Sequence, residues 1–549
     1  MPTNRRRRGK SKSAFPKWTK TAVGLGLGII GFCIPLLFTF TGLSFAGHLA
    51  LGIFLMAAVF WMFEPIPIYS TSMLVIFLQI VLLSTQGPLF QGSQLPETFA
   101  EPVGEQTWSL PAEAVDGDQI FLKKSPTRSE ELSIEVIERN DQVIFFSTEI
   151  TAETPVVAQY KHKLVQYEPV SYTRFFNTLA SPIIILFLGG FMLAAGAVKY
   201  NLDKNLTNVL LKPFGTKPMF IVLGLMLVTA VLSAFMSNTA TTAMMMTVAI
   251  PIAMQVAKED KFRIMLALCI PIAANIGGMA TPIGTPPNAI VISALNQQGL
   301  GIAFGSWMAL MVPLALLLLL LAWGTMRVIF PPTVDSFKLA LKSSFDKSYK
   351  AIMLYAIFGL TVLLWVTEAQ HGIPSGMIAF LPIAGLTVTS VLSKDDVRSL
   401  PWEVLWLVAG GIALGISMEN TGLAIWLVSS ISWEMLPQFM LLLVFGFVAL
   451  MLSNFLSNTV TATLLIPLAI SMGTAGIGGE GFNLIITSLL IGSACNMAML
   501  LPISTPPNAI AMSTGFIKTA DMVKVGIVIG IFGLLTALTM ALIYWPFLI

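Results

Sequence analysis

Long apolar segments follow one another along most of this chain, and short polar stretches separate them. A helix needs about 20 apolar residues to cross the hydrocarbon core of a bilayer. By that measure the pattern predicts eleven transmembrane helices, at 22–44, 46–63, 67–86, 181–200, 264–297, 306–329, 351–367, 374–392, 402–421, 482–516 and 522–547. The fold class it predicts is an all-α polytopic membrane protein.

Two further apolar segments, 218–257 and 436–474, each carry a polar Ser-Asn-Thr cluster in the middle. Lys217 and Lys258 flank the first segment, so both of its ends are expected in the cytosol. No Lys or Arg lies close to either end of the second segment, which is therefore expected to enter from outside. We interpret both as re-entrant hairpins with the polar cluster at the tip, because non-helical backbone at membrane depth must face protein or a wet cavity.

The two halves of the chain repeat the same order of features. Asn238 and Asn458 lie 220 residues apart, and so do Thr285 and Thr505, each in a Gly/Pro-containing break of an apolar segment. An odd number of spans separates equivalent elements, so the halves have opposite orientations. Inverted repeats with broken helices at the midplane are typical of secondary transporters.

Residues 86–172 interrupt the first repeat and have no counterpart in the second. This segment is polar and contains alternating runs such as 119–122 and 143–146, which predict short strands. Three spans precede it. We therefore expect a small β-rich insertion on the extracytoplasmic side.

Composition supports a membrane protein and excludes other classes. Only 11% of the 549 residues are charged and 55% are hydrophobic, whereas soluble domains carry about 25% charged residues. A net charge of +3 is too small to indicate a nucleic-acid partner, and three cysteines without a CxxC spacing predict neither a disulfide framework nor a zinc site. The basic run Arg5 to Arg8 predicts a cytoplasmic N-terminus ahead of an uncleaved first span.

Four broken elements, two hairpin tips and two interrupted helices, are expected to converge near the bilayer centre. Helix N-termini there offer free N–H groups that attract an anion, while carbonyl, hydroxyl and amide oxygens suit sodium. The hairpins and breaks contain no Arg, Lys, Asp or Glu. A single Ser-Asn-Thr would indicate helix packing, but both features occur twice at one spacing. Glu64 and Glu368 fit interfacial or capping roles better than proton carriage.

These paired Ser-Asn-Thr motifs, the paired Thr-Pro-Pro-Asn breaks beginning at Thr285 and Thr505, and the Trp-x-x-Glu openings at Trp61 and Trp365 resemble the divalent anion/sodium symporter family, which includes dicarboxylate, citrate and sulfate carriers. The resemblance covers nearly the whole chain except the N-terminal tail and the insertion. It implies a homodimer in which a transport domain moves as an elevator against a scaffold domain.

The resemblance also implies which residues form the site. Substrate contact would come from Ser237, Asn238, Thr239, Ser457, Asn458, Thr459, Thr285, Pro286, Thr505 and Pro506. A first sodium site would fall on Ser233, Ser237, Asn238 and backbone near Gly284. A second would fall on Ser453, Asn458 and backbone near Leu456 and Ser504, which takes the place of Gly284.

The same reasoning divides the chain into eight parts. They are a basic cytosolic tail (1–20), scaffold helices (21–85), the insertion (86–172), a scaffold helix with an interfacial segment (173–217), a transport-domain hairpin and broken helix (218–330), a cytosolic linker (331–350), scaffold helices of repeat two (351–435) and its hairpin and broken helix (436–549).

The predicted function is sodium-coupled symport of a small divalent anion, with a C4 dicarboxylate as the first candidate, across a plasma membrane such as a bacterial inner membrane. Sodium-independent exchange and a sulfate or other oxyanion permease are the close alternatives. A channel, an arsenite-permease-like pump subunit and a receptor are more distant ones. An enzyme is excluded because the spans contain no nucleophile–base pair. No organic cofactor and no nucleic acid are expected, and the C-terminus is expected outside.

Overall fold

The structure is a computed structural model. It describes residues 17–89, 97–104, 107–109, 119–123, 131–132, 136–140, 143–146, 156–161, 170–257, 260–333, 336, 345–429, 436–474 and 482–549. Most of the predicted tail 1–20 and much of the predicted linker 331–350 lie outside the described residues.

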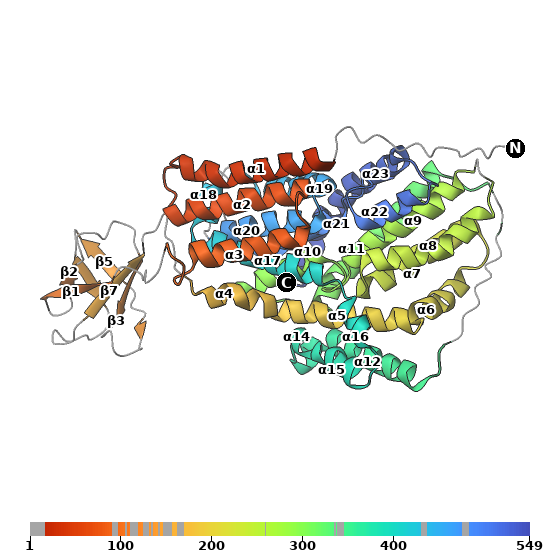
Figure 1. The fold of residues 1–549 in the computed structure, drawn as a ribbon, viewed down its shortest axis with the longest axis horizontal. Helices are drawn as coiled ribbons and strands as arrows, with labels where there is room; N and C mark the ends of the chain where they lie inside the picture. Colours follow the sequence, from red (N-terminus) through yellow and green to blue (C-terminus); the bar gives the residue numbers. More distant parts are fainter. Residues whose placement is uncertain are drawn as a thin grey trace.

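The first three helices are α1 (Lys17–Leu37), α2 (Phe45–Phe63) and α3 (Ile68–Leu83), which pack side by side in Figure 1. The first span was expected to reach residue 44, but α1 ends at Leu37. Gly42 has a φ of +81°, which a helix does not allow, and the Ser44 hydroxyl accepts a hydrogen bond from Gly47 N at 3.0 Å. The chain therefore turns before Ser44 and begins α2 there.

A seven-stranded sheet lies beyond the ends of α3 and α4 (Figure 1). Its strands are β1 (Glu97–Gly104), β2 (Thr107–Ser109), β3 (Gln119–Lys123), β4 (Glu131–Leu132), β5 (Val136–Asn140), β6 (Val143–Phe146) and β7 (Val156–Lys161). The strand order is β4-β3-β7-β1-β2-β6-β5, and the neighbouring strands pair antiparallel. Strands β3 and β6 coincide with the alternating runs at 119–122 and 143–146.

The rest of the first half consists of α4 (Tyr172–Phe176), α5 (Pro182–Lys199), α6 (Leu202–Leu211), α7 (Pro218–Phe235), α8 (Asn238–Met254), α9 (Phe262–Gly278), α10 (Pro286–Gln297) and α11 (Phe304–Ile329), with 3-10 turns at Asn177–Ala180 and Lys212–Phe214. Helices α7 and α8 are separated only by Met236 and Ser237. Met236 is extended, and Ser237 accepts a hydrogen bond from Ala240 N at 3.1 Å, so a new helix starts at Asn238.

The second half consists of α12 (Tyr349–Val366), α13 (Glu368–His371), α14 (Ser375–Ile378), α15 (Phe380–Val388), α16 (Lys394–Arg398), α17 (Trp402–Asn420), α18 (Leu423–Ser429), α19 (Gln438–Phe455), α20 (Asn458–Thr474), α21 (Leu484–Asn496), α22 (Pro506–Ser513) and α23 (Thr519–Thr539), followed by a π-turn Met540–Tyr544 and a 3-10 turn Trp545–Phe547. Helices α14 and α15 lie within the predicted span 374–392, are separated only by Ala379, and together form one apolar helix, Ser375–Val388. Pro382 lacks the N–H that would donate to Ile378 O.

Within the described residues, eight helices are long and apolar enough to cross a membrane, and six shorter apolar helices accompany them. The shorter ones include α9 and α21, each of which is the first part of an apolar segment that a Gly/Pro break divides from α10 or α22. Helices α8 and α20 are both 17 residues long and begin 220 residues apart, at Asn238 and Asn458.

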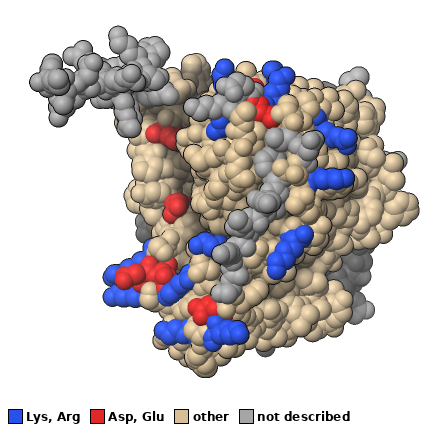
Figure 2. Space-filling model, turned by 90° about the vertical axis from the view of Figure 1, so that its right-hand side faces the viewer, with Lys and Arg blue, Asp and Glu red and all other residues tan. Residues whose placement is uncertain are grey.

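One end of the molecule carries many basic side chains. Figure 2 looks onto the right-hand face of Figure 1, which carries α6, and shows Lys and Arg spread over it with few carboxylates. We call it the basic face. Lys199 pairs with Asp396, and the Arg263 guanidinium lies 4.6 Å from the Phe516 ring centre. The sheet and α18 lie toward the opposite side of Figure 1.

The halves interlock around the site. Helix α10 of the first half packs against α20 of the second, and α22 of the second half packs against α8 and α9 of the first. Helix α7 follows α6 on the basic face, whereas α19 follows α18, which packs against α2 and α20. The two helix pairs therefore start from opposite sides and bring their inner ends to one region.

Candidate functional site

The two Ser-Asn-Thr motifs are helix starts. Ser237 and Ser457 cap α8 and α20, and their hydroxyls accept from Ala240 N at 3.1 Å and Val460 N at 3.2 Å. The first backbone bonds of these helices run from Thr241 N to Ser237 O at 2.9 Å and from Thr461 N to Ser457 O at 3.0 Å. The N–H groups of the first two residues of each helix precede those bonds and are free to bind a ligand.

The Thr-Pro-Pro-Asn motifs are helix starts of a different kind. Thr285 and Thr505 are extended, with φ of −152° and −143°, and two prolines open α10 and α22 after them. Proline fixes the φ of a first helical turn and excludes the helical region for the residue before it. These starts supply the positive end of a helix dipole but lack N–H groups at the two proline positions.

Oxygen atoms converge on Asn238. Its side-chain oxygen lies 2.7 Å from Ser233 Oγ, 3.2 Å from Gly284 O and 3.3 Å from Ala274 O. Two arrangements would satisfy this cluster: a turned amide whose two N–H groups donate towards these acceptors, or a cation among the oxygens. Oxygens bound to one hard cation at about 2.4 Å are roughly 3.4 Å apart. The distances to Gly284 O and Ala274 O are close to that value, whereas the 2.7 Å contact with Ser233 Oγ is a hydrogen-bond distance.

The second repeat has a related cluster. Ser453 Oγ lies 2.9 Å from Asn458 Oδ1 and 3.1 Å from Cys495 O, as Ser233 Oγ lies 2.9 Å from Ala274 O in the first repeat. Both serines are fully buried. Each therefore joins the asparagine of its own hairpin to the following broken helix.

Two asparagines that the sequence analysis did not single out connect the repeats. Asn275 follows Ala274, and its Nδ2 donates to Thr505 Oγ1 at 3.1 Å and to Asn508 Oδ1 at 3.3 Å. Asn496 follows Cys495; it accepts from Thr285 Oγ1 at 3.1 Å and donates to Asn288 Oδ1 at 3.3 Å. Each amide reaches the Thr-Pro-Pro-Asn motif of the opposite repeat.

The spacing of Asn275 and Asn496 in the sequence could have identified them as an equivalent pair. Asn275 and Asn496 lie 221 residues apart in otherwise apolar segments, one residue off the 220 spacing of the motifs. The break in the first repeat is thus one residue longer than the break in the second. Both side chains are at most 1% exposed, and a buried amide in an apolar segment needs partners.

The carbonyl groups at positions 234 and 454 are equivalent, but different hydroxyls bind them. Thr281 Oγ1 donates to Ala234 O in the first repeat, and Ser504 Oγ donates to Asn454 O at 2.9 Å in the second. The Ser504 hydroxyl also accepts from Leu501 N at 3.2 Å. It is therefore engaged with α19 and its own loop, away from Asn458.

The predicted site residues differ in their exposure and in their hydrogen bonds. Thr239 is exposed and Thr459 buried, and neither side chain forms a hydrogen bond within the described part of the chain. Pro286 is half-buried and Pro506 is exposed, while Leu456 is buried at the end of α19. A hydrogen bond connects Ser233 with Asn238, whose side-chain oxygen also lies near Gly284 O. The two asparagine amides link Thr285 and Thr505 to the clusters of the opposite repeats.

Among the described residues, no group of three or more His, Cys, Asp or Glu side chains is placed to hold a metal ion. Glu368 caps two helices instead, since its carboxylate accepts from Phe304 N at 2.7 Å and from Ser375 N at 3.0 Å. The capping role expected for this residue is thus observed. The site itself consists of uncharged oxygens and backbone dipoles.

Comparison with known proteins gives consistent results. A family model described as citrate transporter matches residues 156–492. An uncharacterized transporter of Haemophilus influenzae is 32% identical over 386 residues, which cover 67% of this chain and 82% of that protein. The sodium-dependent high-affinity dicarboxylate transporter 3 of Caenorhabditis elegans is 30% identical over 407 residues, covering 63% and 71%. The sodium-dependent dicarboxylate transporter SdcS of Staphylococcus saprophyticus is 32% identical over 386 residues, covering 63% and 73%.

Proposed function

Because this chain belongs to the citrate transporter family, we propose that it is a secondary transporter that carries a C4 dicarboxylate together with sodium ions. The observation that carries the proposal is the convergence of Ser233 Oγ, Ala274 O and Gly284 O on the Asn238 side-chain oxygen. Relatives at 30–32% identity are named as sodium-dependent dicarboxylate transporters, which supports the same substrate and ion.

Sodium binds, in this proposal, within the two serine–asparagine clusters. The first ion is held by Ser233, Asn238 and backbone near Gly284, with Ser237 beside it. The second is held by Ser453 and Asn458 with backbone oxygens near Leu456 and Ser504. The buried Ser504 hydroxyl is engaged with Asn454 O, so only its backbone is assigned to the ion.

The dicarboxylate lies between the four helix starts. Its carboxylates accept hydrogen bonds from free N–H groups and side chains at the starts of α8 and α20. The residues at these two starts are Ser237, Asn238, Thr239, Ser457, Asn458 and Thr459. Thr285 and Thr505, with Pro286 and Pro506, border the substrate at the starts of α10 and α22. Four dipoles point their positive ends at the anion, and sodium neutralises the remaining charge.

The proposed architecture follows from the repeats. Eleven spans and two re-entrant hairpins form a scaffold domain and a transport domain, divided as the sequence predicts, and the transport domain moves as an elevator in a homodimer. Basic residues favour the cytoplasmic side, so the basic face is assigned to the cytoplasm of a plasma membrane such as a bacterial inner membrane. The insertion and the C-terminus are then extracytoplasmic.

The proposal is tested by uptake of labelled succinate into proteoliposomes that contain the full chain. An inward sodium gradient is expected to drive accumulation, and an equal choline gradient is not. Asn458→Ala is expected to lower uptake strongly. Thr536→Ala is the matched control, because Thr536 is half-buried on α23 and its hydroxyl bonds to Phe532 O of its own helix at 2.7 Å.

The same vesicles distinguish the alternatives. Uptake that requires succinate preloaded inside and ignores sodium would indicate an exchanger and refute the symport. Uptake of sulfate without uptake of succinate or citrate would refute the dicarboxylate. No uptake of any of these anions under any gradient would refute the transporter itself.

A further inference from the structure

A basic pocket lies away from the transport site, between the end of α5, the start of α12 and the loop that joins α15 to α16. It is an open depression of about 740 Å³, and its lining includes the cations Lys199, Lys350, Lys394 and Arg398 and the residues Thr387 and Ser390. We call these six residues the basic pocket.

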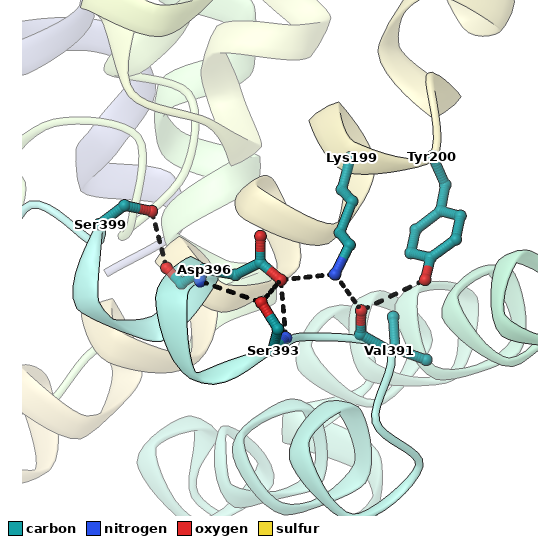
Figure 3. A network of polar contacts seen from close by, with 6 residues as sticks. All are labelled: Lys199, Tyr200, Val391, Ser393, Asp396 and Ser399. Atoms are coloured by element: carbon teal, nitrogen blue, oxygen red, sulfur yellow. Dashed lines mark hydrogen bonds and ion pairs between the residues drawn. The ribbon is translucent and has the colours of Figure 1, made fainter.

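One wall of the basic pocket is held in place by Lys199, as Figure 3 shows. Lys199 Nζ donates to Asp396 Oδ2 at 2.5 Å and to Val391 O at 2.9 Å, and the Tyr200 hydroxyl donates to the same carbonyl at 3.3 Å. Ser390 has a φ of +52°, which turns the chain out of α15. Lys199 is therefore engaged with the protein and shapes the pocket.

The other cations are available to a ligand. Among the described residues, Lys350 and Lys394 form no ion pair, and Arg398 contacts only Asp395, at 3.4 Å, with both side chains exposed. An exposed pair of this kind contributes little. Three cationic groups beside one cavity attract a group with at least one negative charge.

Exposed apolar side chains adjoin the pocket. Val388 follows the lining residue Thr387 at the end of α15 and is 82% exposed, and Tyr349 precedes Lys350 at the start of α12 and is 71% exposed. Helix α12 is also the least buried of the eight membrane-length helices. An aromatic ring at the end of a span is typical of the headgroup level of a bilayer.

We propose that the basic pocket binds the headgroup of an anionic phospholipid, whose phosphate contacts Lys350, Lys394 and Arg398 and whose acyl chains lie along the exposed face of α12 and α15. Basic pockets between membrane helices on the cytoplasmic side bind such headgroups. The adjoining apolar surface favours a lipid over a free soluble anion, because only a lipid covers both surfaces. The inference uses the proposed orientation of the basic face but not the transported substrate.

The test is a native mass-spectrometry titration of the purified full chain in neutral detergent. Phosphatidylglycerol is expected to bind and phosphatidylcholine to bind much more weakly. The triple variant Lys350→Gln, Lys394→Gln, Arg398→Gln is expected to bind phosphatidylglycerol about 100-fold more weakly, since each cation near the surface contributes about 1 kcal/mol and 1.4 kcal/mol is tenfold.

Two further variants control the result. The triple variant Lys204→Gln, Lys212→Gln, Lys217→Gln removes the same charge from exposed positions of α6 and the loop before α7 and is expected to bind like the unmodified protein. Lys350→Arg with Lys394→Arg keeps the charge and is expected to retain binding.

Three outcomes would overturn the proposal. Equal affinity for the two lipids would show that the pocket does not select charge. Equal loss in both triple variants would show a general effect of surface charge. Displacement of phosphatidylglycerol by glycerol phosphate at similar concentration would identify a soluble anion as the occupant. Succinate uptake, measured in parallel, separates this result from the transport proposal.

Discussion

Gly278 offers a direct test of the sodium cluster. A Cβ atom at this position would lie 2.5 Å from Asn238 Oδ1, 2.9 Å from its Nδ2 and 3.1 Å from its Cγ. Gly278 ends α9, and its φ is not positive. Gly278→Ala therefore strains no backbone dihedral, and the three atoms nearest to its Cβ all belong to the Asn238 amide.

The size of the effect follows from these distances. Ordinary van der Waals contact begins near 3.4 Å, so the amide oxygen has to move by roughly 0.9 Å, which removes it from a cation held at about 2.4 Å. A hydrogen-bonding interaction with a charged group contributes about 1.5–3 kcal/mol. The sodium concentration for half-maximal uptake is thus expected to rise roughly 10- to 150-fold.

The assay is succinate uptake into proteoliposomes as a function of external sodium. Gly324→Ala in α11 is the matched control, because a Cβ there meets no atom within 4 Å. Thermal unfolding of both variants checks that each is folded. If Gly278→Ala is folded and has an unchanged sodium dependence, the assignment of Asn238 to a sodium site is wrong. A raised succinate KM with unchanged sodium dependence would assign Asn238 to the substrate alone.

Three further predictions concern stability, each read by thermal unfolding. Asn496→Leu leaves the Thr285 hydroxyl and Asn288 Oδ1 without a partner and is expected to lower the free energy of unfolding by about 2–6 kcal/mol. A midpoint equal to that of the unmodified protein would show that these hydrogen bonds between the repeats do not stabilise the fold. Glu368→Ala removes the cap of α11 and α14 and is expected to cost about 1–3 kcal/mol, and an unchanged midpoint would show that these starts need no carboxylate. Partial burial raises the pKa of Asp396, but hydrogen bonds from Lys199 and Ser393 outweigh it and lower the pKa to about 2. Because this pKa is depressed, the carboxylate stabilises the fold above its ordinary value of 3.8 and loses that contribution as the pH falls towards 2. The gap in midpoint between the unmodified protein and Asp396→Asn is therefore expected to narrow between about pH 4 and pH 2, and a constant gap would refute the ion-pair explanation.

Much of the helical framework was accessible from the sequence, because apolar length and helix-start chemistry are local. Ser237 and Ser457 begin helices where a capping residue follows an apolar run, and the proline pairs after Thr285 and Thr505 begin two more. The family resemblance read from these motifs is confirmed by the matched family model and the relatives. The predicted end of the first span was wrong, because α1 ends at Leu37, before the turn at Gly42.

The hydrogen bonds that join the two repeats could not be predicted from the sequence. Asn275 and Asn496 stand alone in apolar segments, and their partners lie 230 and 211 residues away. Nothing local indicates which distant group satisfies a buried amide. The replacement of the Thr281 hydroxyl by that of Ser504 is equally hidden, because the two residues occupy different places in their loops.

The sequence alone determined that the chain is a duplicated membrane transporter with uncharged polar motifs at four helix starts, since burial, capping and proline stereochemistry act over a few residues. Only the tertiary structure decided that each Thr-Pro-Pro-Asn motif is tied to the opposite repeat through an asparagine, and that oxygens gather around Asn238. Those features depend on how α9 and α22, and α10 and α21, pack together, and packing between distant segments sets distances that no local pattern encodes.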